Sequence, residues 1–128
     1  RNIEVDSNLD EAKTPDIYVS PSLIGEVFLN IMHNAIQAMP DGGTLRIHLE
    51  QVDEKNIKIE IGDTGTGIPE NQQKSIFTAG FSTKKEGKGL GLWFSKAVVE
   101  YHEGEIYFKS QEGVGTTFVI ILPVKSLQ

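Results

Sequence analysis

The chain of 128 residues contains no cysteine. This absence excludes disulfide bonds, thiolate zinc sites and cysteine nucleophiles, and it is consistent with a reducing compartment. Basic residues are also scarce, because 12 lysines and arginines stand against 18 aspartates and glutamates, which gives a formal net charge of −6. The only tight basic cluster is Lys84, Lys85 and Lys88. This charge balance argues against a nucleic acid partner, since a phosphate backbone requires a broad basic surface.

Long apolar runs and a recognisable secretion signal are missing as well. No apolar run approaches the ~20 residues that cross a bilayer. We therefore expect a soluble, cytoplasmic piece, whose parent protein could still be anchored in a membrane. The length fits one compact domain over residues 1–128 with a single core.

Hydrophobic periodicity predicts an α+β domain with a mixed, mainly antiparallel sheet covered on one face by helices. Short strands are expected at residues 3–5, 17–19, 45–49, 57–61, 106–108 and 118–122. A helix is expected from Pro21 to about Met39 with Ser20 as its N-cap, and another from Leu90 to His102. A short helix should follow Pro69 at residues 70–73. Trp93, Ala97 and Tyr101 are expected to pack in the core.

The first long helix carries a polar stripe along an otherwise apolar surface. At ~100° per residue, its members share a sector about 100° wide; they are Glu26, Asn30, His33, Asn34 and Gln37. The stripe could simply face solvent. Alternatively it forms one wall of a pocket, because a carboxamide oxygen can complete a magnesium shell without adding charge.

Asp63 lies two residues beyond the strand expected at residues 57–61. The period of two places its side chain on the same inward side as Ile57, Ile59 and Ile61. One interpretation is a turn in which the backbone of residues 64–67 satisfies the carboxylate. The other is a carboxylate that accepts a hydrogen bond from a ligand amino group, with Gly65 and Gly67 allowing a close backbone approach.

A second glycine loop places Gly87, Gly89 and Gly91 directly before a helix. Amides at a helix N-terminus bind phosphate well, although a flexible hinge would have the same composition. The loop is not a Walker loop, since no GK[ST] ends it. It is not a dinucleotide fingerprint either, since Phe94 stands at the position of the third glycine.

Five ordered motifs together resemble the catalytic ATP-binding (HATPase) domain of sensor histidine kinases, in the GHKL superfamily. They match its N, G1, F, G2 and G3 boxes in order: Glu26 to Asn30, Asn34 and Ala35; Asp63 to Gly65, Gly67 and Ile68; Phe77 to Phe81; Gly87 to Gly89, Gly91 and Leu92; Gly113 to Gly115, Thr116 and Phe118. The resemblance covers nearly the whole chain. It implies the two-layer α/β sandwich that these kinases share with the Hsp90, gyrase B and MutL ATPases.

The resemblance also implies roles for individual residues. Asn34 is similar to the magnesium ligand, Asn30 to its pocket neighbour and Asp63 to the residue that holds the adenine amino group, while Thr116 looks like a further support near the adenine. Phe77, Phe81 and the segment through Lys88 resemble the ATP lid, in which Ser82, Thr83 and Lys84 follow the form of nitrogen-regulation-type sensor kinases. Further nucleotide contacts are implied for Ala38, Gly65, Gly67, Ile68, Gly87, Gly89, Leu90, Gly91 and Leu92.

Asn30 stands where the hydrolytic relatives carry a water-activating glutamate. An amide cannot act as a general base near neutral pH, so we expect ATP and Mg²⁺ to serve phosphoryl transfer to a histidine, with Lys84 or Lys88 neutralising charge. None of the chain's three histidines fits the acceptor motif. The expected partners are the histidine-bearing helical hairpin of the parent protein and, indirectly, a response regulator. A hydrolytic ATPase module and a nucleotide-binding scaffold without turnover remain as alternatives.

Overall fold

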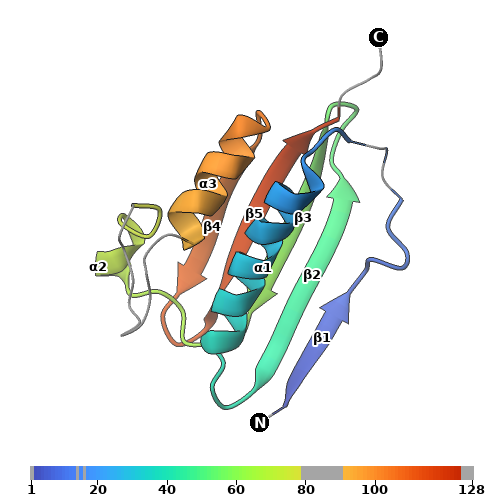
Figure 1. Ribbon diagram of the computed structural model, residues 1–128. Coiled ribbons are helices and arrows are strands. Elements are labelled where there is room, and N and C mark those ends of the chain that lie inside the picture. The colour runs from blue at the N-terminus through green and yellow to red at the C-terminus, as the bar shows by residue number, and fades with distance from the viewer. Residues whose placement is uncertain (1, 14, 16, 79–90, 125–128) are drawn as a thin grey trace.

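A computed structural model describes residues 2–13, 15, 17–78 and 91–124, and its elements form two layers (Figure 1). Helices α1 and α3 lie side by side on one face of a sheet. In chain order the elements are β1 (Ile3–Ser7), α1 (Pro21–Gln37), β2 (Gly43–Gln51), β3 (Asn56–Asp63), α2 (Glu70–Gln73), α3 (Gly91–Tyr101), β4 (Glu105–Gln111) and β5 (Gly115–Pro123). The predicted α+β sandwich is confirmed, as is the short helix after Pro69.

The sheet has five strands in the order β1-β2-β3-β5-β4. β1 runs parallel to β2, and all other neighbours are antiparallel. This arrangement confirms the mixed, mainly antiparallel sheet. It also places the end of β3 beside the start of β5, because Asp63 pairs with Thr116.

The strand expected at residues 17–19 is not formed. Ile17 and Val19 are partly buried and pack against the core, so their alternation serves packing and not strand pairing. The backbone N–H of Ser20 donates to the side chain of His102 at 2.9 Å, where a strand would have used a neighbouring carbonyl. The prediction of a second N-terminal strand was therefore wrong.

Helix α1 begins as the sequence predicts. The Oγ of Ser20 accepts a hydrogen bond from the N–H of Leu23 at 3.3 Å, and Pro21 occupies the first turn, where its missing N–H costs nothing. The helix ends at Gln37, two residues before Met39, and Ala38 is its C-cap. The chain then turns through Gly42, whose positive φ of 96° suits a glycine.

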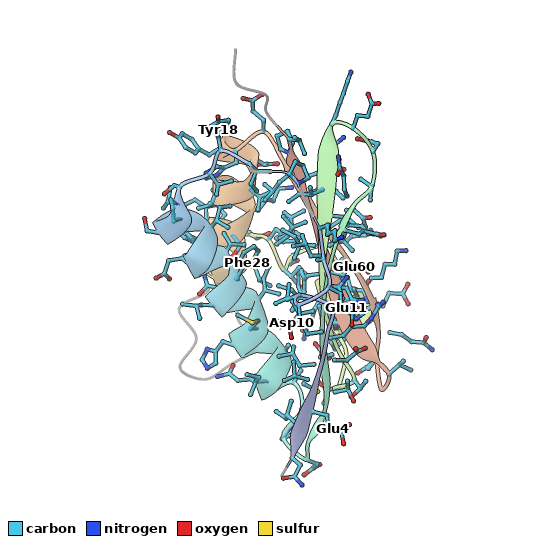
Figure 2. All side chains as sticks on the ribbon, turned by 90° about the vertical axis from the view of Figure 1, so that its right-hand side faces the viewer. Glu4, Asp10, Glu11, Tyr18, Phe28 and Glu60 are labelled. Atoms are coloured by element: carbon cyan, nitrogen blue, oxygen red, sulfur yellow. The ribbon has the colours of Figure 1, made fainter. Side chains whose placement is uncertain are left out.

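The core lies between the two helices and the sheet. Figure 2 shows the sheet edge-on, with Phe28 on the sheet side of α1 and Glu60 on the opposite, open face of the sheet. The fully or nearly buried apolar residues come from both layers and include Val27, Ile31, Ile61, Val99, Ile120 and Leu122. Burying each such side chain contributes about 1.5–3 kcal/mol, and this burial holds the helices onto the strands.

The prediction that Trp93, Ala97 and Tyr101 pack in the core is wrong. Trp93 is 45% and Tyr101 77% exposed, and Ala97 is exposed as well. The helix instead buries Ser95, Val98 and Val99. At ~100° per residue, these lie roughly opposite the first three, so only one of two apolar stripes on α3 can face the sheet.

Candidate functional site

Most of the predicted site residues that the structure describes gather at one end of the sheet, the lower end in Figure 1. The C-terminal half of α1, the start of α3, the ends of β3 and β4 and the start of β5 meet there. Antiparallel pairing brings this about, because β3 and β4 end where β5 begins. Segments far apart in the sequence therefore contribute side chains to one region.

The polar stripe of α1 divides into two parts. Asn30 and Asn34 are partly buried, and the Nδ2 of Asn30 lies 3.5 Å from the carbonyl oxygen of Gly91 at the start of α3. His33 and Gln37 lie on the outer side and contact each other, with 3.1 Å between their side-chain nitrogens. The outer residues of the stripe face solvent, and Asn30 faces the glycine motif of α3. The interpretation of the stripe as one wall of a pocket stays a prediction.

Asp63 uses one of its two carboxylate oxygens to order its own loop. Oδ1 accepts hydrogen bonds from the N–H of Gly65 at 2.9 Å and from the N–H of Thr116 at 3.3 Å. No described residue donates to Oδ2. Burial raises the pKa of this carboxyl, and the two backbone hydrogen bonds oppose that rise. The turn interpretation accounts for Oδ1, and Oδ2 is left as an acceptor for a donor from outside the described fold.

A polar row continues from Asp63 across the sheet. Asp63 pairs with Thr116 on β5, and Thr116 pairs with Ser110 on β4. The hydroxyl oxygens of Ser110 and Thr116 are 2.7 Å apart, and Ser110 Oγ also accepts the N–H of Ile68 at 2.8 Å. Sequence reasoning missed Ser110 because it ended the strand at Phe108. The period of two through Ile106 and Phe108 would have placed Ser110 on the inward face.

The glycines of the first loop fit against protein backbone. A Cβ on Gly65 would overlap the carbonyl oxygen of Ala38. The same oxygen accepts a hydrogen bond from the N–H of Thr66 at 3.0 Å. Gly67 has φ of 72°, and a Cβ there would overlap the carbonyl of Gln111. These contacts hold the loop between the end of α1 and the turn from β4 to β5, so its shape is fixed by packing within the chain.

Phe77 is anchored in an aromatic cluster. Its ring lies edge-on to those of Phe108 and Phe118, with centroid distances of 5.9 and 6.3 Å, and the ammonium of Lys96 lies 5.4 Å from its centroid. Ile68 and Leu92 are likewise partly buried against the core. Several other predicted site residues lie outside the described residues: Phe81, Ser82, Thr83, Lys84, Gly87, Lys88, Gly89 and Leu90.

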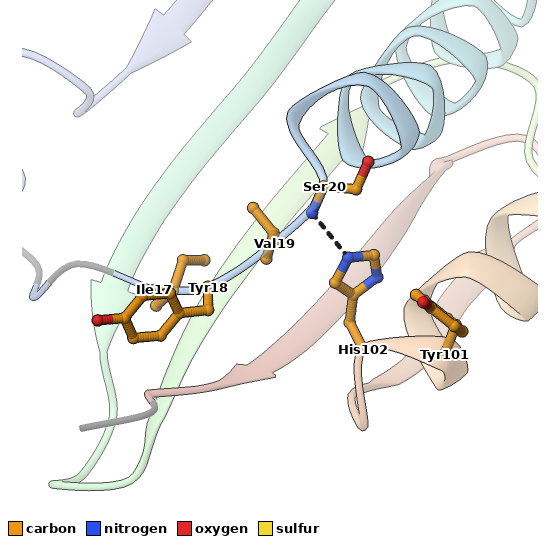
Figure 3. A pocket seen from close by; sticks show the side chains of 6 residues that line it. All are labelled: Ile17, Tyr18, Val19, Ser20, Tyr101 and His102. Atoms are coloured by element: carbon orange, nitrogen blue, oxygen red, sulfur yellow. Dashed lines mark hydrogen bonds between the residues drawn. The ribbon is translucent and has the colours of Figure 1, made fainter. Parts of the chain in front are cut away.

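His102 lies at the other end of the helices and is 8% exposed. Its Nδ1 is 2.8 Å from the carbonyl of Val98, and its Nε2 accepts the N–H of Ser20, as Figure 3 shows. A carbonyl can only accept, so Nδ1 carries the hydrogen of a neutral ring. This contact borders an open hollow of about 580 Å³ between Tyr18 and Tyr101. The expected structural role of His102 fits this geometry.

Within the described ranges, the helices are all too short or too polar to cross a membrane.

Residues 19–126 match the family described as histidine kinase-, DNA gyrase B-, and HSP90-like ATPase. The chain is 41% identical over 111 residues to sporulation kinase E of Bacillus subtilis, covering 87% of this chain and 15% of that protein. It is 41% identical over 118 residues to the signal transduction histidine-protein kinase AtoS of Escherichia coli, covering 92% and 19%. The mycobacterial sensor histidine kinase MprB has a similar structure, with a TM-score of 0.83 at 29% identity, covering 98% of this chain and 84% of that one.

The fold and the ordered motifs define a GHKL-type ATPase domain. The chain belongs to the histidine kinase-, gyrase B- and HSP90-like ATPase family, as the catalytic, ATP-binding domain of a sensor histidine kinase. It spans 15% and 19% of the length of the two curated relatives.

Proposed function

We propose that this domain binds ATP with Mg²⁺ and transfers the γ-phosphoryl group to a histidine on a separate helical hairpin domain of its parent protein. The observation that carries the proposal is Asp63, a half-buried carboxylate whose Oδ1 is tied to the backbone and whose Oδ2 receives no hydrogen bond from a described residue. Such an oxygen suits the exocyclic amino group of adenine, since a charged acceptor in a partly desolvated site makes a strong hydrogen bond.

Asn34 suits the magnesium end of the nucleotide. Magnesium usually keeps several waters and takes only one or two protein oxygens beside the substrate phosphates. Among the described residues no group of three or more histidines, aspartates or glutamates could hold a metal by itself. A single amide oxygen near phosphates fits that pattern. Bound magnesium would neutralise charge on the phosphates, and Asn34 would fix where they lie.

Asn30 favours transfer over hydrolysis. Its carboxamide lies beside the carbonyl of Gly91, and an amide cannot take a proton from water near neutral pH. A neutral imidazole needs no such base. The reaction then depends on positioning the phosphoryl group in line with the incoming nitrogen.

The acceptor histidine should come from another part of the parent protein. His102 uses both ring nitrogens in backbone hydrogen bonds, and His33 lies beside Gln37 on the outer side of α1. His48 lies on β2, 3.4 Å from a carboxylate oxygen of Asp6. A response regulator would then take the phosphoryl group from the hairpin.

Calorimetric titration of this chain with ATP, with and without Mg²⁺, tests the binding half of the proposal. Asn34→Ala should abolish the gain in ATP affinity that Mg²⁺ provides while leaving metal-free binding within about threefold, because the proposed contact of Asn34 with the bound nucleotide is made through the metal. Gln37→Ala, on the outer side of the same helix one turn away, is the matched control. Equal magnesium dependence in wild type and Asn34→Ala would refute the role of Asn34.

A further inference from the structure

Two side chains approach the carbonyl oxygen of Gly91 at the start of α3. Ser95 is fully buried, and its Oγ lies 2.7 Å from this oxygen. The Nδ2 of Asn30, on α1, lies 3.5 Å from the same oxygen. A carbonyl can only accept, so the single hydroxyl hydrogen of Ser95 is donated to Gly91. The direction of this hydrogen bond is therefore fixed by the chemistry of its acceptor.

The acceptor capacity of the Gly91 oxygen explains why the Asn30 contact is long. A carbonyl oxygen has two lone pairs. In an α-helix that begins at Gly91, the N–H of Ser95 points to the first of them, and the Oγ of Ser95 takes the second. Asn30 is thus a third donor, and its distance of 3.5 Å exceeds the usual range of about 2.7–3.2 Å. The Asn30 side chain therefore lies against Gly91 without a strong hydrogen bond to it.

We propose that Ser95 is a positioning residue for nucleotide binding, because it occupies the Gly91 carbonyl and leaves Asn30 only loosely attached to α3. The carboxamide of Asn30 can then turn and donate to a phosphate oxygen of the bound nucleotide. This inference rests on the proposed ATP-binding function. A side chain that is already well hydrogen-bonded within the protein must give up that bond before it binds a ligand, and the lost bond lowers the affinity. Ser95 removes this penalty by taking the lone pair that Asn30 would otherwise use.

A purely structural role for Ser95 predicts a different result. Helical serines often donate to the carbonyl one turn earlier, and this bond can simply satisfy a buried hydroxyl. Its loss would then alter α3 in the same way whichever residue stands at position 30. If Ser95 acts through Asn30, its loss should weaken nucleotide binding only while Asn30 is present.

The first measurement follows the side-chain amide protons of Asn30 by NMR in the chain without nucleotide. Their signals are identified by their absence in Asn30→Ala. In Ser95→Ala the freed lone pair should accept a hydrogen bond from Asn30, so one amide proton should shift downfield. Ser95→Cys should act in the same way, because a thiol has a similar shape but is a weak donor. Unchanged Asn30 signals in both variants would refute the inference.

The second measurement is a calorimetric titration with ATP and Mg²⁺ of the wild type, Ser95→Ala, Asn30→Ala and the double variant. Ser95→Ala should bind about three- to tenfold more weakly than the wild type, the value of one hydrogen bond. The double variant should bind within about 1.5-fold of Asn30→Ala, since the two effects are coupled. Val99→Ala, at another fully buried residue of α3, is the matched control. Its effect on affinity should be the same in the wild type and in Asn30→Ala.

The outcomes separate this inference from the proposed function. A wild-type chain that does not bind ATP overturns both. If the wild type binds ATP and Ser95→Ala keeps full affinity, or lowers it by the same factor in the Asn30→Ala background, only the role of Ser95 is wrong. If Ser95→Ala does not fold, Ser95→Cys carries both measurements. If Asn30→Ala binds too weakly to titrate, the downfield shift decides, and its absence refutes the inference.

Discussion

At the scale of single residues, Asp63 stabilises its loop through hydrogen bonds and destabilises the fold through its charge. Burial raises its pKa above the ordinary value of about 4, despite the hydrogen bonds from Gly65 and Thr116. An acid with a raised pKa in the folded state stabilises the fold below its unfolded pKa, and that contribution is lost as the pH rises through the folded pKa. The ionised carboxylate therefore lowers stability at neutral pH.

The first prediction concerns Asp63→Asn in the absence of nucleotide. Because Oδ1 of asparagine can accept both backbone hydrogen bonds, the variant should unfold at an equal or higher temperature than the wild type at pH 7. The difference should vanish below about pH 4, where the wild-type carboxyl is protonated. Thermal unfolding from pH 3 to 8 measures this. A variant less stable than the wild type at pH 7 would show that the charge is not penalised.

The same variant should lose nucleotide affinity. The substituted side chain would present an amide N–H or a neutral oxygen where the charged acceptor stood, and losing a hydrogen bond to a charged group costs about 1.5–3 kcal/mol, or about 10- to 100-fold. ATP and ADP should be affected alike, and Mg²⁺ should not restore binding. Asp53→Asn is the control, because Asp53 lies in an exposed turn, where the N–H of Lys55 lowers the pKa of its carboxyl. Unchanged affinity of folded Asp63→Asn would refute the adenine assignment.

Sequence alone pointed to residues that belong to a motif, such as Asp63 and Asn30. The structure shows the hydrogen bonds that each of them makes, and their roles in nucleotide binding stay predictions. Ser110 was missed because it belongs to no motif and its partners, Ile68 and Thr116, come from two other segments. A role that depends on pairing between strands becomes visible only when the register is known.

At the scale of elements, the first glycine loop depends on close backbone packing at Gly65. Gly65→Ala should lower the melting temperature or prevent folding, because the added Cβ would overlap the carbonyl of Ala38. Gly25→Ala is the matched control. Gly25 lies inside α1 with no atom within 4 Å of the added Cβ, so alanine should stabilise the helix by about 0.5–1 kcal/mol. Chemical denaturation of both variants tests this. Equal effects would contradict the packing described for the loop.

Helices α1 and α3 are also joined through His102 at the end away from the loop. His102→Ala should lower the free energy of unfolding by about 2–4 kcal/mol, because it leaves the Ser20 N–H without its acceptor and removes a buried ring. Nucleotide affinity of the folded variant should stay within about twofold. Tyr101→Ala, at the neighbouring exposed residue, should change stability by less than about 0.5 kcal/mol. A mild effect of His102→Ala would contradict the joining role.

Most elements were predictable because their periodicity is clear, and the two errors share a physical cause. The Ile17 and Val19 alternation and the Trp93, Ala97 and Tyr101 stripe are both genuine apolar patterns. An apolar pattern predicts that side chains share one face of an element. It does not predict which part of the protein that face contacts. In α3 the other stripe, through Val98 and Val99, is the one that is buried against the core. Residues 17–19 pack without a strand partner among the described residues. Tertiary packing settled both cases.

At the scale of the whole molecule, the candidate site and the His102 contact lie at opposite ends of the two helices. Ligand binding at the lower end should stabilise the entire domain, since a small domain unfolds cooperatively. ATP at 100 times its dissociation constant should add about 2.7 kcal/mol to the free energy of unfolding. Thermal unfolding over a range of ATP concentrations measures this, and Asp63→Asn should show a much smaller shift at the same concentrations. A shift in Asp63→Asn equal to that of the wild type would contradict the site.

The domain covers only 15% and 19% of two curated kinases. The reaction proposed for it transfers the phosphoryl group to a separate hairpin domain. Transfer of label from γ-labelled ATP to a supplied hairpin domain, followed by acid treatment, tests this central claim most directly. We predict that the label on the hairpin is acid-labile, since phosphohistidine is acid-labile, and that it requires the histidine of the hairpin. The label should be lost in Asn34→Ala and should not form on this chain alone. Acid-stable label, strong labelling of the isolated chain, or full transfer by Asn34→Ala would contradict the account.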